Sequence, residues 1–110
     1  RGFDSPAGQG IWMTLVLKPE IDPNHASMIT LVTALAVSKA ITDMTGRPAS
    51  IKWPNDIIMS GKKVCGILTE MSAQFDYVNH IVERGSACVL VQSVDKEYLV
   101  QSVIARIVGI

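Results

Sequence analysis

The chain has 110 residues, enough for one domain that buries roughly two-thirds of its unfolded surface. Apolar residues make up 48% and charged residues 18%, which is the composition of a packed globular domain and excludes a disordered tail. Ten basic residues balance ten acidic ones, so we expect no broad electrostatic binding to nucleic acid or to an anionic membrane.

The cysteines and the apolar stretches bear on the cellular compartment. Cys65 and Cys88 are far apart and lack a metal-binding spacing. A buried free thiol is the ordinary interpretation of Cys65, so a reduced, cytoplasmic location is predicted, although two cysteines leave a disulfide open. No signal-peptide pattern opens the chain, and the uncharged stretch 23–38 is shorter than the ~20 residues of a membrane-spanning helix. Because the chain starts at Arg1 in a segment that reads as mid-domain, we expect a piece of a longer protein.

The first half of the chain predicts a loop, a strand and a helix. Residues 1–9 are rich in turn formers and predict the loop. Residues 11–18 alternate as a strand whose two faces are both largely covered, and a proline ends it. An Asp-Pro pair then starts a helix over residues 22–45. Its broad apolar stripe, suited to packing on a sheet, consists of Met28, Leu31, Val32, Leu35 and Ala36.

The second half predicts a sheet and one more helix. Four strand candidates, joined by short turns, favour antiparallel pairing of neighbours: 50–53, 57–59, 64–71 and 77–82. Residues 83–92 fit neither a clean turn nor a clean strand, although 87–91 could form a short one. Residues 96–108 carry an apolar helical face. The predicted fold class is α+β, with a mixed, mainly antiparallel sheet and helices packed on one face.

A strand–corner–strand element is the most informative part of the sequence. Pro54 ends the first strand because it has no N–H to donate, and Asn55 and Asp56 suit the tight corner that follows. The chain turns at Ser60-Gly61 and returns through Lys62-Lys63. Lysines and a carboxylate are thus brought together between apolar strands, which is suited to an anionic substrate. Composition alone would make Lys63 a solvated turn lysine and Asn-Asp a bare turn.

In their order and spacing, these residues resemble the biotin protein ligases, the biotin–[acetyl-CoA-carboxylase] ligases. The resemblance rests on Lys52-Trp53-Pro54-Asn55-Asp56, on Lys63 seven residues later, and on Gly66-Ile67-Leu68 followed by Glu70. Residues 1–8 look like the tail of that family's Gly/Arg-rich loop, and residues 1–82 follow the family order. The fold implied is that of biotin ligases, which is similar to class II aminoacyl-tRNA synthetases.

The resemblance implies an ATP-dependent, two-step acyl transfer. Biotin's carboxylate attacks the α-phosphate of ATP to give biotinyl-AMP, and a lysine of a carboxylase carrier domain then attacks the mixed anhydride. Joining two anions while charge grows on phosphoryl oxygens requires fixed cations and Mg²⁺. The implied partner is a biotin carboxyl carrier protein or domain, and a homodimer is compatible with the sequence.

For the biotin side of the site, the resemblance implies one catalytic residue, Lys63, which bridges the biotin carboxyl group and the α-phosphate. Gly66 matches a glycine whose backbone lies against biotin, and a strand glycine often marks such a close approach. Trp12 and Leu68 look like the wall for the apolar bicycle and the valeryl chain, and either could equally be plain core.

For the nucleotide side, Arg1 matches a phosphate-binding arginine, and Phe3 stands where the family carries a tryptophan that stacks on adenine. Asn55 is implied to face the adenylate. Asp56 is implied to face a Mg²⁺ ion or to orient lysine and water. Lys52 stays undecided between pointing at the nucleotide and pairing with a carboxylate, Asp56 or Glu70.

Two parts of the family pattern are not found in this sequence. The first Gly-Arg-Gly-Arg portion would lie upstream of Arg1, and Glu83-Arg84-Gly85-Ser86 stands where the family continues with Gly-x-Gly-Ile-Asn-x-Asn. We therefore expect residues 1–110 to be a single partial catalytic domain, without the DNA-binding and C-terminal β-domains of repressor-type members. The alternatives are a lipoate–protein ligase-like enzyme and a non-catalytic biotin-binding remnant.

Overall fold

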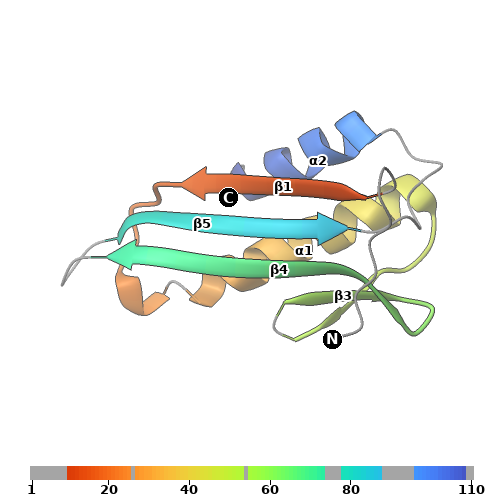
Figure 1. The fold of residues 1–110 in the computed structure, drawn as a ribbon, viewed down its shortest axis with the longest axis horizontal. Coiled ribbons are helices and arrows are strands. Elements are labelled where there is room, and N and C mark those ends of the chain that lie inside the picture. Colours follow the sequence, from red (N-terminus) through yellow and green to blue (C-terminus); the bar gives the residue numbers. More distant parts are fainter. Residues whose placement is uncertain (1–9, 26, 54, 74–77, 88–95, 109–110) are drawn as a thin grey trace.

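The described part of the chain forms one antiparallel sheet with two α-helices on one side (Figure 1). The computed structural model describes residues 10–25, 27–53, 55–73, 78–87 and 96–108. The sheet order is β1-β5-β4-β3-β2, and every described pairing is antiparallel, which confirms the α+β class. The elements are β1 (Ile11–Leu17), η1 (Pro23–His25), α1 (Ser27–Thr45), β2 (Ser50–Lys52), β3 (Asp56–Met59), β4 (Lys62–Ala73), β5 (Val78–Ala87) and α2 (Lys96–Val108).

The β3–β4 hairpin closes through the two residues predicted from the sequence. Ser60 and Gly61 have φ angles of 52° and 76°, and Met59 pairs with Lys62 directly across the turn. Two positive φ values in a two-residue loop are the geometry whose twist matches that of the flanking strands. The turn therefore fixes the register in which β4 leaves the corner.

Replacing Gly61 with alanine should weaken this hairpin. Nothing lies within 4 Å of the position where a Cβ would be added, so the cost comes from backbone strain at positive φ alone. We expect the free energy of unfolding to fall by about 1 kcal/mol in denaturant titrations. Ser60→Gly is the matched control, because it relieves the same strain one residue earlier and should leave stability equal or higher. Equal loss in both variants would contradict the turn geometry.

Strand β5 is longer than the sequence predicted. It was expected over residues 77–82, but it continues to Ala87 and pairs on both sides, with Leu15 and Thr69 flanking Glu83. The segment after Val82 mixes a carboxylate, a cation and glycine, so its local β propensity is weak. Backbone pairing with two neighbouring strands overrides that propensity.

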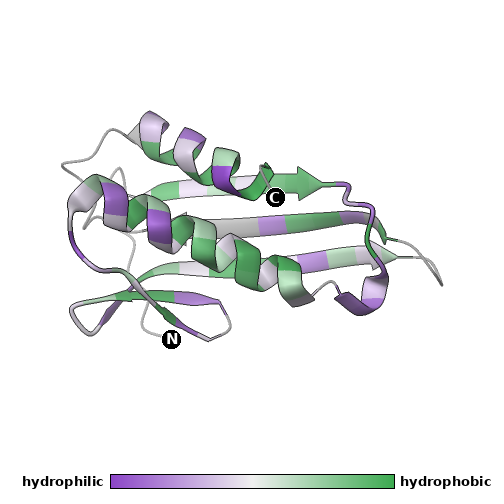
Figure 2. Ribbon diagram, turned by 180° about the vertical axis from the view of Figure 1, so that it is seen from behind, coloured by the Kyte–Doolittle hydropathy of each residue, from purple (hydrophilic) through white to green (hydrophobic). Residues whose placement is uncertain are grey.

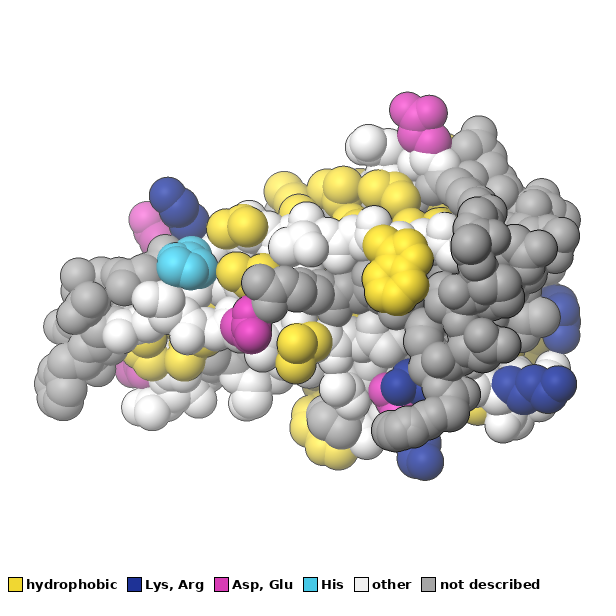
Figure 3. Space-filling model, in the orientation of Figure 1, with side chains coloured by type: hydrophobic (Ala, Val, Ile, Leu, Met, Phe, Trp, Pro, Cys, Tyr) yellow, Lys and Arg dark blue, Asp and Glu magenta, His cyan; other side chains and the backbone are white. Residues whose placement is uncertain are grey.

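The helices cover only one face of the sheet, as Figure 2 shows from behind. Along β1, partly buried side chains alternate with exposed ones, and Trp12 and Val16 are 70% and 58% exposed. The prediction that both faces of this strand are covered was therefore wrong. The alternation of the two faces along β1 was predicted correctly. The error was to expect the apolar residues of the outward face to be buried. The side of the sheet on which no described helix packs is called the open face below, and Figure 3 views the molecule from this side.

Helix α1 begins later than predicted. Asp22 accepts a hydrogen bond from the Asn24 N–H through Oδ1 (2.8 Å) and one from the His25 N–H through its carbonyl oxygen (2.9 Å). These bonds close a short 3₁₀ turn, so the Asp-Pro signal starts η1 and the α-helix follows from Ser27. The predicted end is confirmed: Gly46, at φ 71°, returns its N–H to the Thr42 carbonyl oxygen.

The buried face of α1 agrees with the apolar stripe predicted from the sequence only at Ala36. Met28 and Leu35 are exposed, and the buried side chains are Thr33, Ala34, Ala36, Ala40 and Ile41. The helix is apolar almost all round, so its sequence does not select one stripe. Small residues let the helix axis approach the sheet closely. The face of α1 that carries them therefore packs against the sheet.

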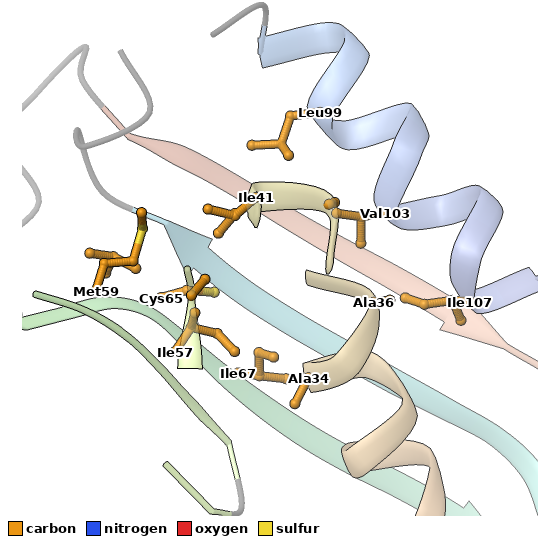
Figure 4. Close-up of a cluster of buried hydrophobic side chains, with 13 residues drawn as sticks. Ala34, Ala36, Ile41, Ile57, Met59, Cys65, Ile67, Leu99, Val103 and Ile107 are labelled. Atoms are coloured by element: carbon orange, nitrogen blue, oxygen red, sulfur yellow. The ribbon is translucent and has the colours of Figure 1, made fainter. Parts of the chain in front are cut away.

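By length and composition alone, Pro23–Thr45 passes the test for a membrane-spanning helix, unlike the shorter uncharged stretch considered above. The core helix of a globular domain passes the same test. Here α1 contributes fully buried Ala34 and Ala40 to a core shared with the sheet and α2. Figure 4 shows part of that core, with Leu99, Val103 and Ile107 projecting from α2, the helix predicted over residues 96–108.

Candidate functional site

A row of residues crosses all five strands on the open face. Trp12 pairs with Ser86, Ser86 with Gly66, Gly66 with Asp56, and Asp56 with Lys52. Residues in register on adjacent strands lie on the same face of a sheet. Antiparallel register thus aligns four predicted site residues, each from a different strand, in one row across the sheet.

A β-bulge places Lys63 on this face. Ile57 pairs with Cys65 but Ile58 pairs with Lys63, so Val64 is an extra residue in β4. Strict alternation would put Lys63 with Cys65 and Ile67 on the helix-covered side. The bulge reverses this parity: Val64 and Cys65 are both buried, and Lys63 emerges beside Gly66.

The ammonium of Lys63 is held next to the corner. Its Nζ lies 3.3 Å from Oδ1 of Asp56, and the two side chains are 34% and 28% exposed. The pair is half-buried, so the lysine is fixed in direction while it stays accessible from the open face. This is the cation–carboxylate cluster that the strand–corner–strand pattern predicted.

Gly66 provides the space that the lysine occupies. A Cβ added at Gly66 would lie 3.2 Å from Cε and 3.3 Å from Nζ of Lys63, closer than ordinary van der Waals contact. The lysine side chain therefore crosses directly over the glycine backbone. The group that approaches this strand glycine is a side chain of the same strand, and the contact of Gly66 with biotin stays a prediction.

Gly66→Ala should displace the Lys63 ammonium. The added methyl would push against Cε and Nζ of Lys63. Adenylate formation, the reaction that the family resemblance implies for this lysine, should then slow about tenfold, with a smaller change in stability. Adenylate formation and urea unfolding, measured on the same preparations, separate the two effects. An unchanged activity would show that the lysine does not need its present path over residue 66.

Asn55 anchors the corner to β4. Its amide Nδ2 donates to the Ile67 carbonyl oxygen at 2.8 Å, and the Ile67 N–H donates to the Asn55 carbonyl oxygen at 3.0 Å. This double contact holds the segment between β2 and β3 against the strand that carries Lys63 and Gly66. The role of Asn55 toward an adenylate stays a prediction.

The remaining predicted residues fall into three groups. Trp12 and Leu68 are both exposed on the open face, so neither is plain core. Lys52 is exposed beside Asp56 in the register, while the ion pair of Asp56 is made with Lys63. Arg1 and Phe3 lie outside the described residues.

The described part of the chain gives little support to two kinds of chemistry, metal binding by clustered side chains and nucleophilic attack by a thiolate. It holds no group of three or more His, Cys, Asp or Glu side chains that could bind a metal ion. Asp56 is a single carboxylate already paired with an ammonium. Burial raises the pKa of the Cys65 thiol to about 12, so this residue carries no thiolate at neutral pH, as expected for a buried free cysteine.

A sheet with one open face and a fixed lysine at its centre defines a domain able to receive an anionic ligand. The sequence profile of the Biotin/lipoate A/B protein ligase family matches residues 1–91, and the chain belongs to this family. It is 44% identical over 82 residues to the bifunctional ligase/repressor BirA of Bacillus subtilis, covering 74% of this chain and 25% of that protein.

Other relatives agree with this assignment. The biotin–[acetyl-CoA-carboxylase] ligase of Paracoccus denitrificans is 44% identical over 74 residues, which are 66% of this chain and 30% of that protein. The chain thus spans about a quarter to a third of these relatives. The biotin protein ligase of Aquifex aeolicus superposes with a TM-score of 0.74 at 25% identity, over 92% of this chain and 51% of that chain.

Proposed function

We propose that this chain carries the central part of an ATP-dependent biotin–protein ligase, which forms biotinyl-AMP and transfers biotin to a lysine of a carboxylase carrier domain. The observation that carries the proposal is the Lys63 ammonium, oriented by Asp56 over Gly66 in the middle of the open face. Family membership supports ligase chemistry, and the names of the relatives support biotin as the acid.

The geometry suits the first step of that reaction. A carboxylate and an α-phosphate repel each other, and negative charge grows on the phosphoryl oxygens as they join. A cation already fixed by a neighbouring carboxylate stabilises this charge with little reorganisation. Lys63 would lie between the two anions, while Trp12 and Leu68 offer exposed apolar surface on the same face for the bicycle and the valeryl chain.

Mg²⁺ fits this site only as a companion of the nucleotide. The described residues offer Asp56 and no metal-binding cluster around it. Because Mg²⁺ is usually bound by one or two carboxylates together with substrate phosphates, Asp56 could supply at most one protein oxygen. One solved biotin protein ligase of Aquifex aeolicus is a complex with biotin and ATP, with a TM-score of 0.69 to this chain.

A lipoate–protein ligase is the second candidate, because the matched family includes both biotin and lipoate enzymes. A non-catalytic biotin-binding remnant is the third. The proposed domain organisation is a single partial catalytic domain in a cytoplasmic protein, with a biotin carboxyl carrier as partner.

Intact-mass spectrometry of an apo-carrier domain separates the three candidates. The full gene product is incubated with ATP and either biotin or lipoate, and we expect a biotin adduct on one lysine of the carrier. A lipoyl adduct would favour the second candidate. Biotin binding by calorimetry without any adduct would identify the remnant. Omitting ATP is the control, and it should abolish the adduct.

A further inference from the structure

Two hydrogen bonds between Asn55 and Ile67 lie directly beside the ion pair of the candidate site. Asn55 precedes Asp56 in the chain, and Ile67 follows Gly66, the residue that pairs with Asp56 across β3 and β4. The Nδ2 group of Asn55 donates to the Ile67 carbonyl oxygen at 2.8 Å, and the Ile67 N–H donates to the Asn55 carbonyl oxygen at 3.0 Å. Asn55 is thus bound to β4 through its side chain as well as its backbone.

The strand that begins at Asp56 is short and lies near the edge of the sheet. β2 and β3 are the last two strands in the sheet order and have only three and four residues. The bulge between Ile57 and Ile58 interrupts the ladder that joins β3 to β4. Ile57 is fully buried and anchors β3 in the core, but hydrophobic burial is not directional. The placement of Asp56 in the plane of the sheet therefore depends on hydrogen bonds next to it.

The ion pair between Lys63 and Asp56 is too exposed to fix this geometry by itself. The two side chains are 34% and 28% exposed, and an ion pair open to water contributes little because water screens it and the lysine loses conformational freedom. The pair joins the same two strands as the bonds of Asn55, so its length depends on how closely β3 approaches β4. The neutral bonds of Asn55 therefore set the position of the carboxylate that orients the ammonium.

We propose that Asn55 is a positioning residue, whose side-chain amide holds Asp56 against β4 and thereby keeps the Lys63 ammonium in place for adenylate formation. The consequence for catalysis rests on the proposed ligase function, whereas the positioning is a property of the protein without substrates. This role is distinct from the contact with an adenylate that the family resemblance implies, because Nδ2 is engaged within the protein.

Amide hydrogen exchange of the full gene product without substrates is the first test. In Asn55→Ala, the Ile67 amide should exchange about tenfold faster, because the bond that holds its acceptor in place is lost. The Leu68 amide should keep its protection, since successive N–H groups of a strand point to opposite neighbours and this one faces β5. Asn24→Ala is the matched control, with the same change at an exposed asparagine of η1. If Asn55→Ala does not fold, Asn55→Asp, which keeps the shape and removes the donor, replaces it in this measurement.

The NMR signal of the Lys63 ε-methylene group, assigned by its absence from Lys63→Ala, is the second test without substrates. Asp56→Asn defines where this signal lies when the ion pair is lost. Asn55→Ala should move the signal toward that position, and Asn24→Ala should leave it unmoved. An unmoved Lys63 signal or an unchanged exchange rate of the Ile67 amide in Asn55→Ala would overturn the proposal.

Single-turnover release of pyrophosphate with biotin and ATP measures the catalytic consequence. Asn55→Ala should slow the reaction about tenfold at saturating ATP, while the ATP concentration that gives half the maximal rate changes less than about threefold. A loss of ATP affinity alone would make Asn55 only a nucleotide contact and would overturn the proposal, as would an unchanged rate at saturating ATP. If the unaltered protein forms no adenylate, the proposed function fails, and the two measurements without substrates still decide whether Asn55 positions the ion pair.

Discussion

Lys63→Ala should lower the rate of biotinyl-AMP formation by about 10²–10³-fold, which corresponds to about 3–4 kcal/mol of lost charge stabilisation. The ammonium is the only described cation in an ion pair at the centre of the open face. Its side chain is one-third exposed, so its removal empties little core volume and should hardly change the urea midpoint. Pyrophosphate release in single-turnover experiments with biotin and ATP measures the effect.

Lys62→Ala is the matched control for that measurement. Lys62 is the preceding residue, carries the same charge and is exposed at the turn, opposite Met59. Its removal should leave adenylation within about twofold, because surface charges far from the reacting atoms contribute little. Equal losses in the two variants would show that net charge matters and the position of Lys63 does not. An active Lys63→Ala would refute the role proposed for it.

The strand–corner–strand element could be predicted because each of its signals is local. A proline has no N–H to donate to a ladder, Ser60-Gly61 adopts the positive φ pair of a tight hairpin, and the two strands that flank this turn then pair. The proximity of Lys63 to Asp56 follows from that hairpin. The family resemblance added the chemistry, and the family assignment is confirmed.

The direction of Lys63 could not be read from the sequence. It depends on one extra residue in β4, Val64, and a bulge of this kind has no clear sequence signal. Without the bulge, period-two alternation would turn Lys63 toward the helices. The inner face of α1 was predicted only in part, at Ala36, for a related reason: an almost uniformly apolar helix leaves the choice of face to tertiary packing.

Glu83 was overlooked because the sequence placed it outside any strand. A carboxylate after Val82 predicted the end of β5, whereas the structure buries it between Thr69 and Leu15 in a continuous ladder. The only available signal was negative: the apolar alternation of the strand breaks there. At this break the strand carries the buried carboxyl group of Glu83, and its effect on the stability of the fold can be measured.

Glu83→Gln should make the protein more stable, and increasingly so as pH rises. Burial raises the pKa of the Glu83 carboxyl group above its ordinary value of 4.5, against the opposing effect of the Thr69 hydrogen bond. The folded chain thus binds this proton more tightly than the unfolded chain. The contribution of the protonated Glu83 side chain to the free energy of unfolding is fully present below the ordinary pKa. It is lost as pH rises through the raised pKa of the folded state.

At pH 8 the unaltered chain therefore carries a buried carboxylate with one unpaired oxygen, and the glutamine variant does not. We expect the variant to gain about 1–3 kcal/mol in free energy of unfolding at pH 8 and little at pH 4. Denaturant titrations across this range give the difference curve, in which the other carboxylates cancel. Glu70→Gln, exposed on the same strand pair, should stay within about 0.5 kcal/mol throughout. A flat difference curve for Glu83→Gln would mean that residue 83 keeps its charge at no cost, through a contact that compensates for burial.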